Sequence, residues 1–198
     1  PYRLRSNKYV DRELFSELVS VVSSRAPDRY VYISMGGMHL VDHFSVYRRA
    51  GLQKLLAFDF DPEVVERQRF NVPCRTAVCD EFHSSELPDK LEGILRDHHA
   101  DHAIIWLDFT EKKYYGQLKE VSAMVAKLQP GDVLRVTLNA DSTSLRKKFA
   151  ELNKADKEKT EAEKLALVFQ SEVVEFFPSS ITEIANKKFA NALVSSVH

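Results

Sequence analysis

The sequence has few cysteines and no long apolar run. Cys74 and Cys79 are its only cysteines, and their spacing fits neither a disulfide framework nor a zinc site. We therefore expect two free thiols in a reducing compartment. No apolar stretch is long enough to cross a bilayer, and the polar opening PYRLRSNKYVDR lacks the apolar core of a secretory signal. These absences make a cytoplasmic location the default expectation and indicate no membrane partner.

The sequence also has no excess of acidic or of basic residues. Lys and Arg total 28 and Asp and Glu total 29, which gives a net charge of −1. Because no global field attracts polyanions, nucleic acid is not indicated as a partner. The chain has 198 residues, of which 44% are hydrophobic, enough for one sizeable globular core. We expect a single domain over residues 1–198.

The sequence does contain a regular alternation of apolar runs and amphipathic segments. The apolar runs predict strands at residues 29–34, 52–58, 74–79, 103–107 and 132–138. The segments between and before them predict helices at residues 12–24, 40–50, 63–70, 87–97 and 114–128. This order predicts an α/β fold of Rossmann-like, doubly wound type. Its core, residues 29–141, is expected to be a mostly parallel sheet with helices on both faces.

The character of the chain changes after the last predicted strand. Residues 141–164 mix acidic and basic side chains, which is typical of a solvated helix or loop. Two further helices are predicted at residues 165–177 and 181–194, interrupted at Pro178. Residues 142–198 are therefore expected to form a charged helical extension. No convincing sixth or seventh strand follows, and one interpretation is that the chain is cut before them.

Polar residues stand at the ends of four predicted strands. In parallel sheets ligands bind at the carboxyl ends of the strands, where the strand order reverses, and here we expect that point beside the first strand. Glycines allow close approach of backbone to a ligand, and the N–H groups of a following helix can bind an anion. An acid after the second strand is well placed to accept ribose hydroxyls. The strand ends are Ser34-Met35-Gly36-Gly37, Asp59-Phe60-Asp61, Asp80-Glu81 and Asp108-Phe109-Thr110.

From Arg29 to Asp141 the sequence resembles class I S-adenosylmethionine-dependent methyltransferases. The resemblance rests on YVYISMGG, LLAFDFDPEVVERQ, AVCDEF, AIIWLDFTE and LQPGDVLRVTLN. The opening PYRLRSNKYVDRELF with ISMGG is also similar to bacterial proteins labelled putative O-methyltransferases. The resemblance implies S-adenosylmethionine as the cofactor and a role for each strand end. Ser34, Gly36 and Gly37 would form the cofactor loop, and Asp59 would bind the ribose. Phe60 or Asp61 would lie near the adenine, and Asp80 or Glu81 would approach the adenine amine. Asp108 would face the methyl donor and substrate.

The sequence also departs from that family pattern. The usual loop is acid-x-Gly-x-Gly-x-Gly, but Ser34 stands in place of the acid, and Met38 and His39 occur where later glycines are usual. The DFTE segment is not the Asp/Asn-Pro-Pro-aromatic motif of enzymes that methylate amino groups of nucleic-acid bases.

Two kinds of function stay open on this basis. The first is methyl transfer to an oxygen or nitrogen nucleophile of an unknown acceptor. The second is a catalytically inactive Rossmann-like module for binding or regulation. Such a module could assemble as a homo-oligomer, and it could be a component of a bacterial defence system.

Metal binding is not predicted. Asp108, Asn139 and Asp141 offer oxygen atoms suitable for magnesium, but the last two are not contiguous, unlike the pair in catechol-type O-methyltransferases. His39 and His43 lack a third ligand. The histidine-rich stretch at residues 97–102 precedes a strand and so lies at the wrong edge of the sheet.

Two smaller questions are left open by the sequence. Tyr114 and Tyr115 are expected to pack in the fold, although a pocket-lining role is the alternative. Arg3, Arg5 and Lys8 either cover the site as a lid or belong to a surface tail.

Overall fold

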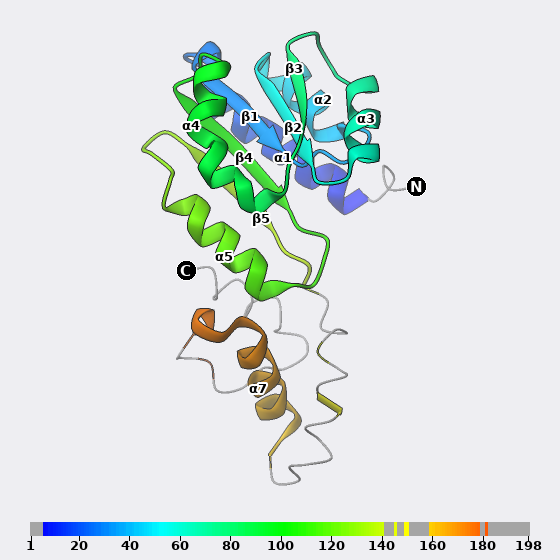
Figure 1. The fold of residues 1–198 in the computed structure, drawn as a ribbon, viewed down its shortest axis with the longest axis vertical. Helices are drawn as coiled ribbons and strands as arrows, with labels where there is room; N and C mark the ends of the chain where they lie inside the picture. The colour runs from blue at the N-terminus through cyan, green and yellow to red at the C-terminus, as the bar shows by residue number, and fades with distance from the viewer. Residues whose placement is uncertain (1–5, 141–144, 146–148, 151–158, 179–180, 182–198) are drawn as a thin grey trace. The chain divides into compact units, whose positions relative to one another are not determined.

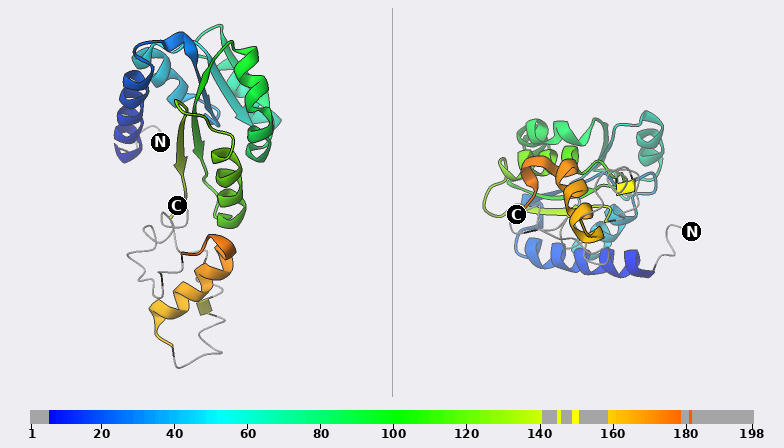
Figure 2. Two further views of the ribbon diagram at one scale, coloured as in Figure 1. Left: turned by 90° about the vertical axis from the view of Figure 1, so that its left-hand side faces the viewer. Right: turned by 90° about the horizontal axis from the view of Figure 1, so that it is seen from below.

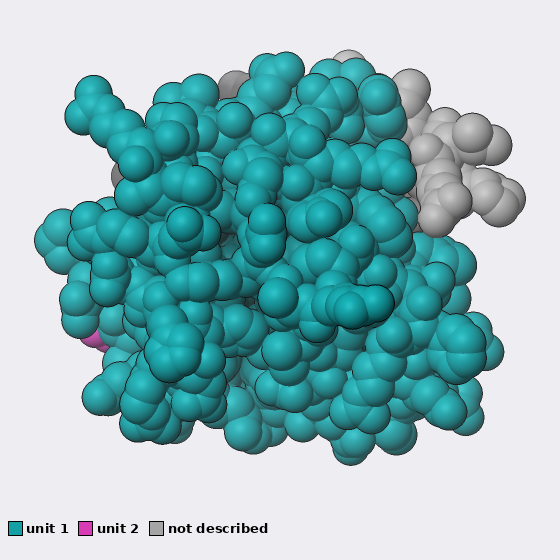
Figure 3. All heavy atoms as spheres, turned by 90° about the horizontal axis from the view of Figure 1, so that it is seen from above, with its two compact units in different colours: residues 1–108, 127–136 teal, residues 109–126, 137–198 magenta. Residues whose placement is uncertain are grey.

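The computed structural model describes residues 6–140, 145, 149–150, 159–178 and 181, and the chain divides into two compact units. The face drawn in Figure 3 is formed mainly by unit 1. Unit 1 comprises residues 1–108 and 127–136, and unit 2 comprises residues 109–126 and 137–198. The expectation of a single domain stays a prediction.

A five-stranded parallel sheet forms the framework, in the order β3-β2-β1-β4-β5 (Figures 1 and 2). Strand β1 pairs in parallel with both β2 and β4, so the strand order reverses at β1. This arrangement confirms the predicted Rossmann-like, doubly wound sheet. The strands are β1 (Tyr30–Ser34), β2 (Leu55–Asp59), β3 (Ala77–Glu81), β4 (His102–Asp108) and β5 (Val133–Thr137).

Helices follow the strands as predicted and cover both faces of the sheet. Within unit 1, α1 and α4 lie on opposite sides of the sheet (Figure 2). The helices are α1 (Ser6–Ser23), α2 (Val41–Ala50), α3 (Pro62–Phe70), α4 (Leu87–Asp97), α5 (Tyr114–Val125) and α7 (Glu161–Val173). Short 3-10 turns occur at Pro27–Arg29, Ser84–Glu86 and Val174–Phe176.

The main core of unit 1 lies between the sheet and the pair of helices α1 and α2. The side chains of this core alternate along the strands onto one face, as a strand period of two requires. Strand β4 is buried from Ala103 to Leu107, which confirms the prediction that its apolar run is covered on both faces. The core consists of Phe15 and Val19 from α1, Val46 from α2, Leu52 from the loop before β2, and Tyr32, Leu55, Ile104 and Trp106 from the strands.

The helix ends follow local sequence signals. Helix α2 ends at Gly51, which adopts φ of 69°, a left-handed conformation that glycine reaches without a Cβ clash. Helix α3 begins with Pro62, and the Asp61 side chain accepts a hydrogen bond from Glu63 N over 2.9 Å. Both caps agree with the predictions from sequence.

Several element boundaries differ from the predictions. Helix α1 begins at Ser6 rather than residue 12, and β3 covers Ala77–Glu81 rather than residues 74–79. Helix α7 begins at Glu161, inside the charged segment, because Thr160 and Glu163 form a reciprocal capping box. Of the helix predicted at residues 181–194, all but residue 181 falls outside the described residues.

Unit 2 has a small core of its own. Tyr114 and Leu118 of α5 are buried together with residues of α7, and the rings of Tyr114 and Phe169 meet edge to face with centroids 6.2 Å apart. The Tyr114 hydroxyl donates to Asn139 O over 2.8 Å. These contacts confirm that Tyr114 packs in the fold. Among the described residues, no helix combines the length and apolarity needed to cross a bilayer.

Candidate functional site

The carboxyl edge of the sheet carries four polar side chains that point to one face. Ser34 pairs in register with Ala57 and Trp106, and Asp59 pairs with Glu81. Because side chains two residues apart share a face, Ser34, Asp59, Glu81 and Asp108 all alternate to the face that α1 and α2 cover. Asp80 alternates to the opposite face.

The segment after β1 is a tight loop with three left-handed residues. Gly36, Gly37 and Leu40 have φ values of 66°, 54° and 48°. The Gly37 amide donates to Met35 O over 2.7 Å, and the Leu40 amide donates to Gly37 O over 3.3 Å. Helix α2 therefore begins at Val41, and its first N–H groups have no partner within the helix.

The two glycines have different surroundings. A Cβ atom on Gly36 would lie 2.7 Å from Leu40 Cδ2 and 2.8 Å from His43 Cε1, so the space beside Gly36 is filled by the protein itself. A Cβ atom on Gly37 would meet nothing within 4 Å. Gly37 is thus the position where the backbone of this loop is open to a ligand.

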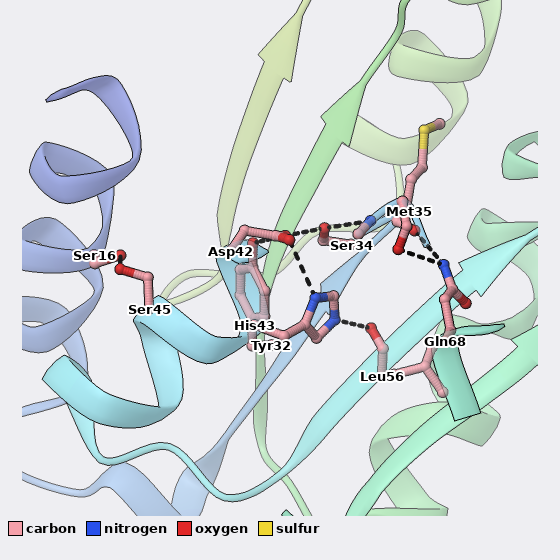
Figure 4. Close-up of polar contacts among 11 residues, drawn as sticks. Ser16, Tyr32, Ser34, Met35, Asp42, His43, Ser45, Leu56 and Gln68 are labelled. Carbon is pink, nitrogen blue, oxygen red and sulfur yellow. Dashed lines mark hydrogen bonds and ion pairs between the residues drawn. The ribbon is translucent and has the colours of Figure 1, made fainter. Parts of the chain in front are cut away.

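A buried polar network lies beneath the loop (Figure 4). Asp42, in the first turn of α2, accepts hydrogen bonds at Oδ2 from Ser34 Oγ over 2.5 Å and from the Tyr32 hydroxyl over 2.7 Å. Ser34 Oγ in turn accepts a hydrogen bond from Gly36 N over 3.0 Å. The Ser34 hydroxyl is therefore engaged inside the protein as both donor and acceptor.

The Asp42 carboxylate is held in its charged form. Burial disfavours the charge, but the adjacent His43 and the hydrogen bonds from Ser34 and Tyr32 outweigh burial, so the pKa of Asp42 is lowered from its ordinary value. Burial, and then the charge of Asp42, raise the pKa of the Tyr32 hydroxyl well above its ordinary value. Asp42 is a site residue that sequence reasoning missed.

His43 connects this network to β2. Its Nε2 lies 3.0 Å from Leu56 O, which accepts only, so Nε2 carries a hydrogen. Its Nδ1 lies 3.4 Å from Asp42 Oδ1. His43 is 1% exposed, whereas His39, four residues earlier, is exposed.

Helix α3 holds the loop from the other side. The fully buried Gln68 donates from Nε2 to Met35 O over 2.8 Å, and Asn71 Nδ2 donates to Met38 O over 2.9 Å. Gln68 was also missed from the sequence, where one glutamine on a polar helix gives no signal.

The acids after β2 have separate local tasks. Asp59, the last residue of β2, accepts a hydrogen bond at Oδ1 from Asp61 N over 3.0 Å. Asp61 caps α3, and Phe60 is 66% exposed with its ring 5.8 Å from that of His83. Of the three, Asp59 is the one that the alternation of the strand turns to the face of Ser34.

The acids of β3 lie on different sides of the sheet. Glu81 is paired in register with Asp59. Asp80 instead lines a groove of about 520 Å³ on the α4 side, together with Lys54, Arg75 and His98. Sequence reasoning left Asp80 and Glu81 as alternatives, and only Glu81 shares a sheet face with Asp59.

Asp108 ends β4 with one oxygen engaged and one not. Its Oδ2 lies 3.6 Å from Lys8 Nζ at the start of α1. Its Oδ1 is buried and has no hydrogen-bond partner among the described residues. Lys8 is therefore part of an ordered helix that reaches this strand end, while Arg3 and Arg5 lie outside the described residues.

No metal site is evident in the part of the chain that the structure describes, where no three His, Cys, Asp or Glu side chains come together. Asp141 lies outside the described residues. Asn139 donates from Nδ2 to Thr110 O over 2.9 Å and accepts from Tyr114 at its carbonyl, so it serves the loop after β5.

Comparison with known proteins gives one family. The family described as "Putative O-methyltransferase" matches over residues 1–198. No curated protein matches the chain.

Proposed function

The chain belongs to the family described as "Putative O-methyltransferase", and from this premise we propose that it is an S-adenosylmethionine-dependent methyltransferase. The methyl group would pass to an oxygen nucleophile of the acceptor, or alternatively to a nitrogen nucleophile. The observation that carries the proposal is that Asp59 and Asp108 face the same side of the sheet at the edge where the Gly37 backbone is open.

The residues at this edge fit the cofactor. The open space at Gly37 would admit a ligand against the backbone, next to the first N–H groups of α2. Asp59 has acceptor oxygens for ribose hydroxyls, and its neighbour Glu81 is the better placed of the two β3 acids for the adenine amine. The buried, unpartnered Oδ1 of Asp108 supplies an acceptor on the same face.

In methyl transfer the main task of the protein is to position the acceptor relative to the methyl group. When bound, the cofactor would supply a methyl group on a sulfonium, and transfer of that group to the nucleophile would leave a neutral thioether. The proton of a hydroxyl acceptor must leave, and Asp108 Oδ1 would receive it or orient the hydroxyl. Lys8 Nζ, 3.6 Å from Oδ2, would help to hold the Asp108 side chain in place for this task. Holding the acceptor in line is the larger contribution.

Calorimetry tests this proposal directly. The chain should bind S-adenosylhomocysteine, and Asp59→Asn should weaken binding roughly tenfold or more because a charged hydrogen-bond acceptor is lost. Asp101→Asn is a matched control at the opposite edge of the same sheet, where Asp101 makes an exposed ion pair with Arg29. No binding by the wild-type chain at millimolar cofactor would reject the proposal.

One observation favours the inactive module as second candidate. Ser34, which the resemblance assigned to the cofactor loop, directs its hydroxyl to Asp42 and Gly36 rather than outward. A stable oligomer in light scattering, together with no cofactor binding in calorimetry, would select this candidate.

A further inference from the structure

The loop after β1 has no acid at the strand end, yet a carboxylate lies directly beneath it. We propose that Asp42, from the first turn of α2, is the positioning acid of the cofactor loop, acting through Ser34 on the Gly36 amide. This inference rests on the proposed function. It assigns to Asp42 the place that the methyltransferase pattern gives to an acid at the end of the first strand, where this chain has Ser34.

The hydrogen bonds form a directed relay. A serine hydroxyl has one hydrogen, and Ser34 gives it to Asp42 Oδ2 over 2.5 Å. The lone pairs of Ser34 Oγ are then left to accept from Gly36 N over 3.0 Å. A charged acceptor at the start of the relay polarises the hydroxyl and strengthens its bond to the amide. The charge of Asp42 therefore reaches the loop backbone through one side chain.

The relay fixes the part of the loop that faces the protein. The Gly36 amide is held by Ser34, and the space where a Cβ atom would stand is filled by Leu40 and His43. The adjacent Gly37 keeps its free space toward solvent. Anchoring Gly36 thus sets the orientation of the residue that a ligand would approach, without placing Asp42 itself against the ligand.

A role in packing alone does not account for this network. Asp42 is 8% exposed and His43 is 1% exposed, so a carboxylate and an imidazole are held where apolar side chains would serve at lower cost. Tyr32 donates to the same oxygen of Asp42, whereas the Gly36 amide donates to Ser34. Tyr32 therefore offers a way to separate the general stability of the network from its hold on the loop.

The main test exchanges the acid between its two positions. Asp42→Ser should weaken binding of S-adenosylhomocysteine roughly tenfold or more, as expected for loss of a charged hydrogen-bond partner. The double variant Ser34→Asp/Asp42→Ser returns an acid to the end of β1 and should recover most of that affinity. Ser45→Ala is the control, because Ser45 lies on the same helix but contacts Ser16 of α1 (Figure 4). Its hydroxyl also contacts Glu13 of α1. Wild-type affinity in a folded Asp42→Ser variant would overturn the inference.

A second measurement needs no cofactor. Hydrogen exchange of the Gly36 amide, followed by NMR, should be faster in Asp42→Asn than in the wild type, and unchanged in Ser45→Ala. Tyr32→Phe should lower the thermal unfolding temperature yet keep Gly36 protected. If the wild type binds no cofactor, the proposed function fails while this exchange still decides the role of Asp42. Equal exchange in wild type and a folded Asp42→Asn variant would overturn that role.

Discussion

The Gly36 backbone and the His43 imidazole lie so close that no side chain fits between them. A Cβ atom on Gly36 would stand 2.8 Å from His43 Cε1, whereas the same atom on Gly37 would meet nothing within 4 Å. Both glycines have positive φ, at 66° and 54°. Both glycines therefore need a left-handed backbone, but only Gly36 also lacks the space for a side chain.

Alanine substitutions should separate these two demands. Gly37→Ala should lower the free energy of unfolding by about 1–2 kcal/mol, the cost of a left-handed alanine. Gly36→Ala should add an overpacking cost, for a total of about 3 kcal/mol, because Leu40 and His43 are both buried and cannot easily move. Urea unfolding followed by the fluorescence of Trp106, the only tryptophan, measures both. Equal losses would contradict the close approach at Gly36.

Most of the fold could be predicted because local signals and the period of apolar residues agree. The buried run of β4, the proline and aspartate that open α3 and the glycine that ends α2 each carry their own physical reason. The start of α1 could not be predicted because its first turns are polar. Lys8 pairs with Asp108 and Asp11 pairs with Arg135, and such contacts between distant parts of the chain are invisible in a local pattern.

Strand β3 was misplaced for a related reason. As an edge strand it has only one buried residue, Cys79, so its apolar pattern is weak. Cys74 and Thr76, which were counted as strand, instead bond through their side chains to Gln53 O. Asp42 was missed because an acid in the first turn of a helix usually serves the helix itself. Its partners Tyr32 and Ser34 become evident only in the structure, where both side chains point toward Asp42.

Loss of the Asp61 cap should be a measurable but modest defect. Asp61→Ala removes the acceptor for Glu63 N and should lower the free energy of unfolding by about 1 kcal/mol. Asp61→Asn should stay near the wild type, since asparagine caps a helix equally well. Urea unfolding gives both values. A full loss in Asp61→Asn would mean that the charge, rather than the cap, is what stabilises α3.

Arg135 should contribute through the aromatic rings beneath it. Its guanidinium carbon lies 3.8 Å from the centre of the Trp106 ring and 4.6 Å from that of Phe15, and it also pairs with Asp11. Arg135→Met should lower the free energy of unfolding by about 1–2 kcal/mol. Arg49→Met is the matched control, because it removes an ion pair with Glu13 of the same helix α1 and should cost less than about 1 kcal/mol. Equal costs in chemical unfolding would exclude a contribution from the rings.

The charge of Asp42 predicts the acid sensitivity of unit 1. The pKa of Asp42 is lowered in the folded protein, so below the unfolded value the unfolded chain binds one proton more. The stabilisation that follows is present at neutral pH and is lost as the pH falls below about 4, the ordinary value for aspartate. The wild type should therefore lose up to about 1.4 kcal/mol of unfolding free energy per pH unit through this group.

Asp42→Asn removes that titration. At pH 7 the variant should be less stable by about 2 kcal/mol, because hydrogen bonds to a charged acceptor become bonds to a neutral one. Below pH 4 its stability should fall less steeply than that of the wild type, so the two curves approach each other. Urea unfolding followed by Trp106 fluorescence reports on unit 1, and Ser45→Ala should keep the wild-type slope. Parallel curves for Asp42→Asn and the wild type would mean that the pKa of Asp42 is the same in the folded and the unfolded chain, so the hydrogen bonds beneath the loop would not stabilise its charged form.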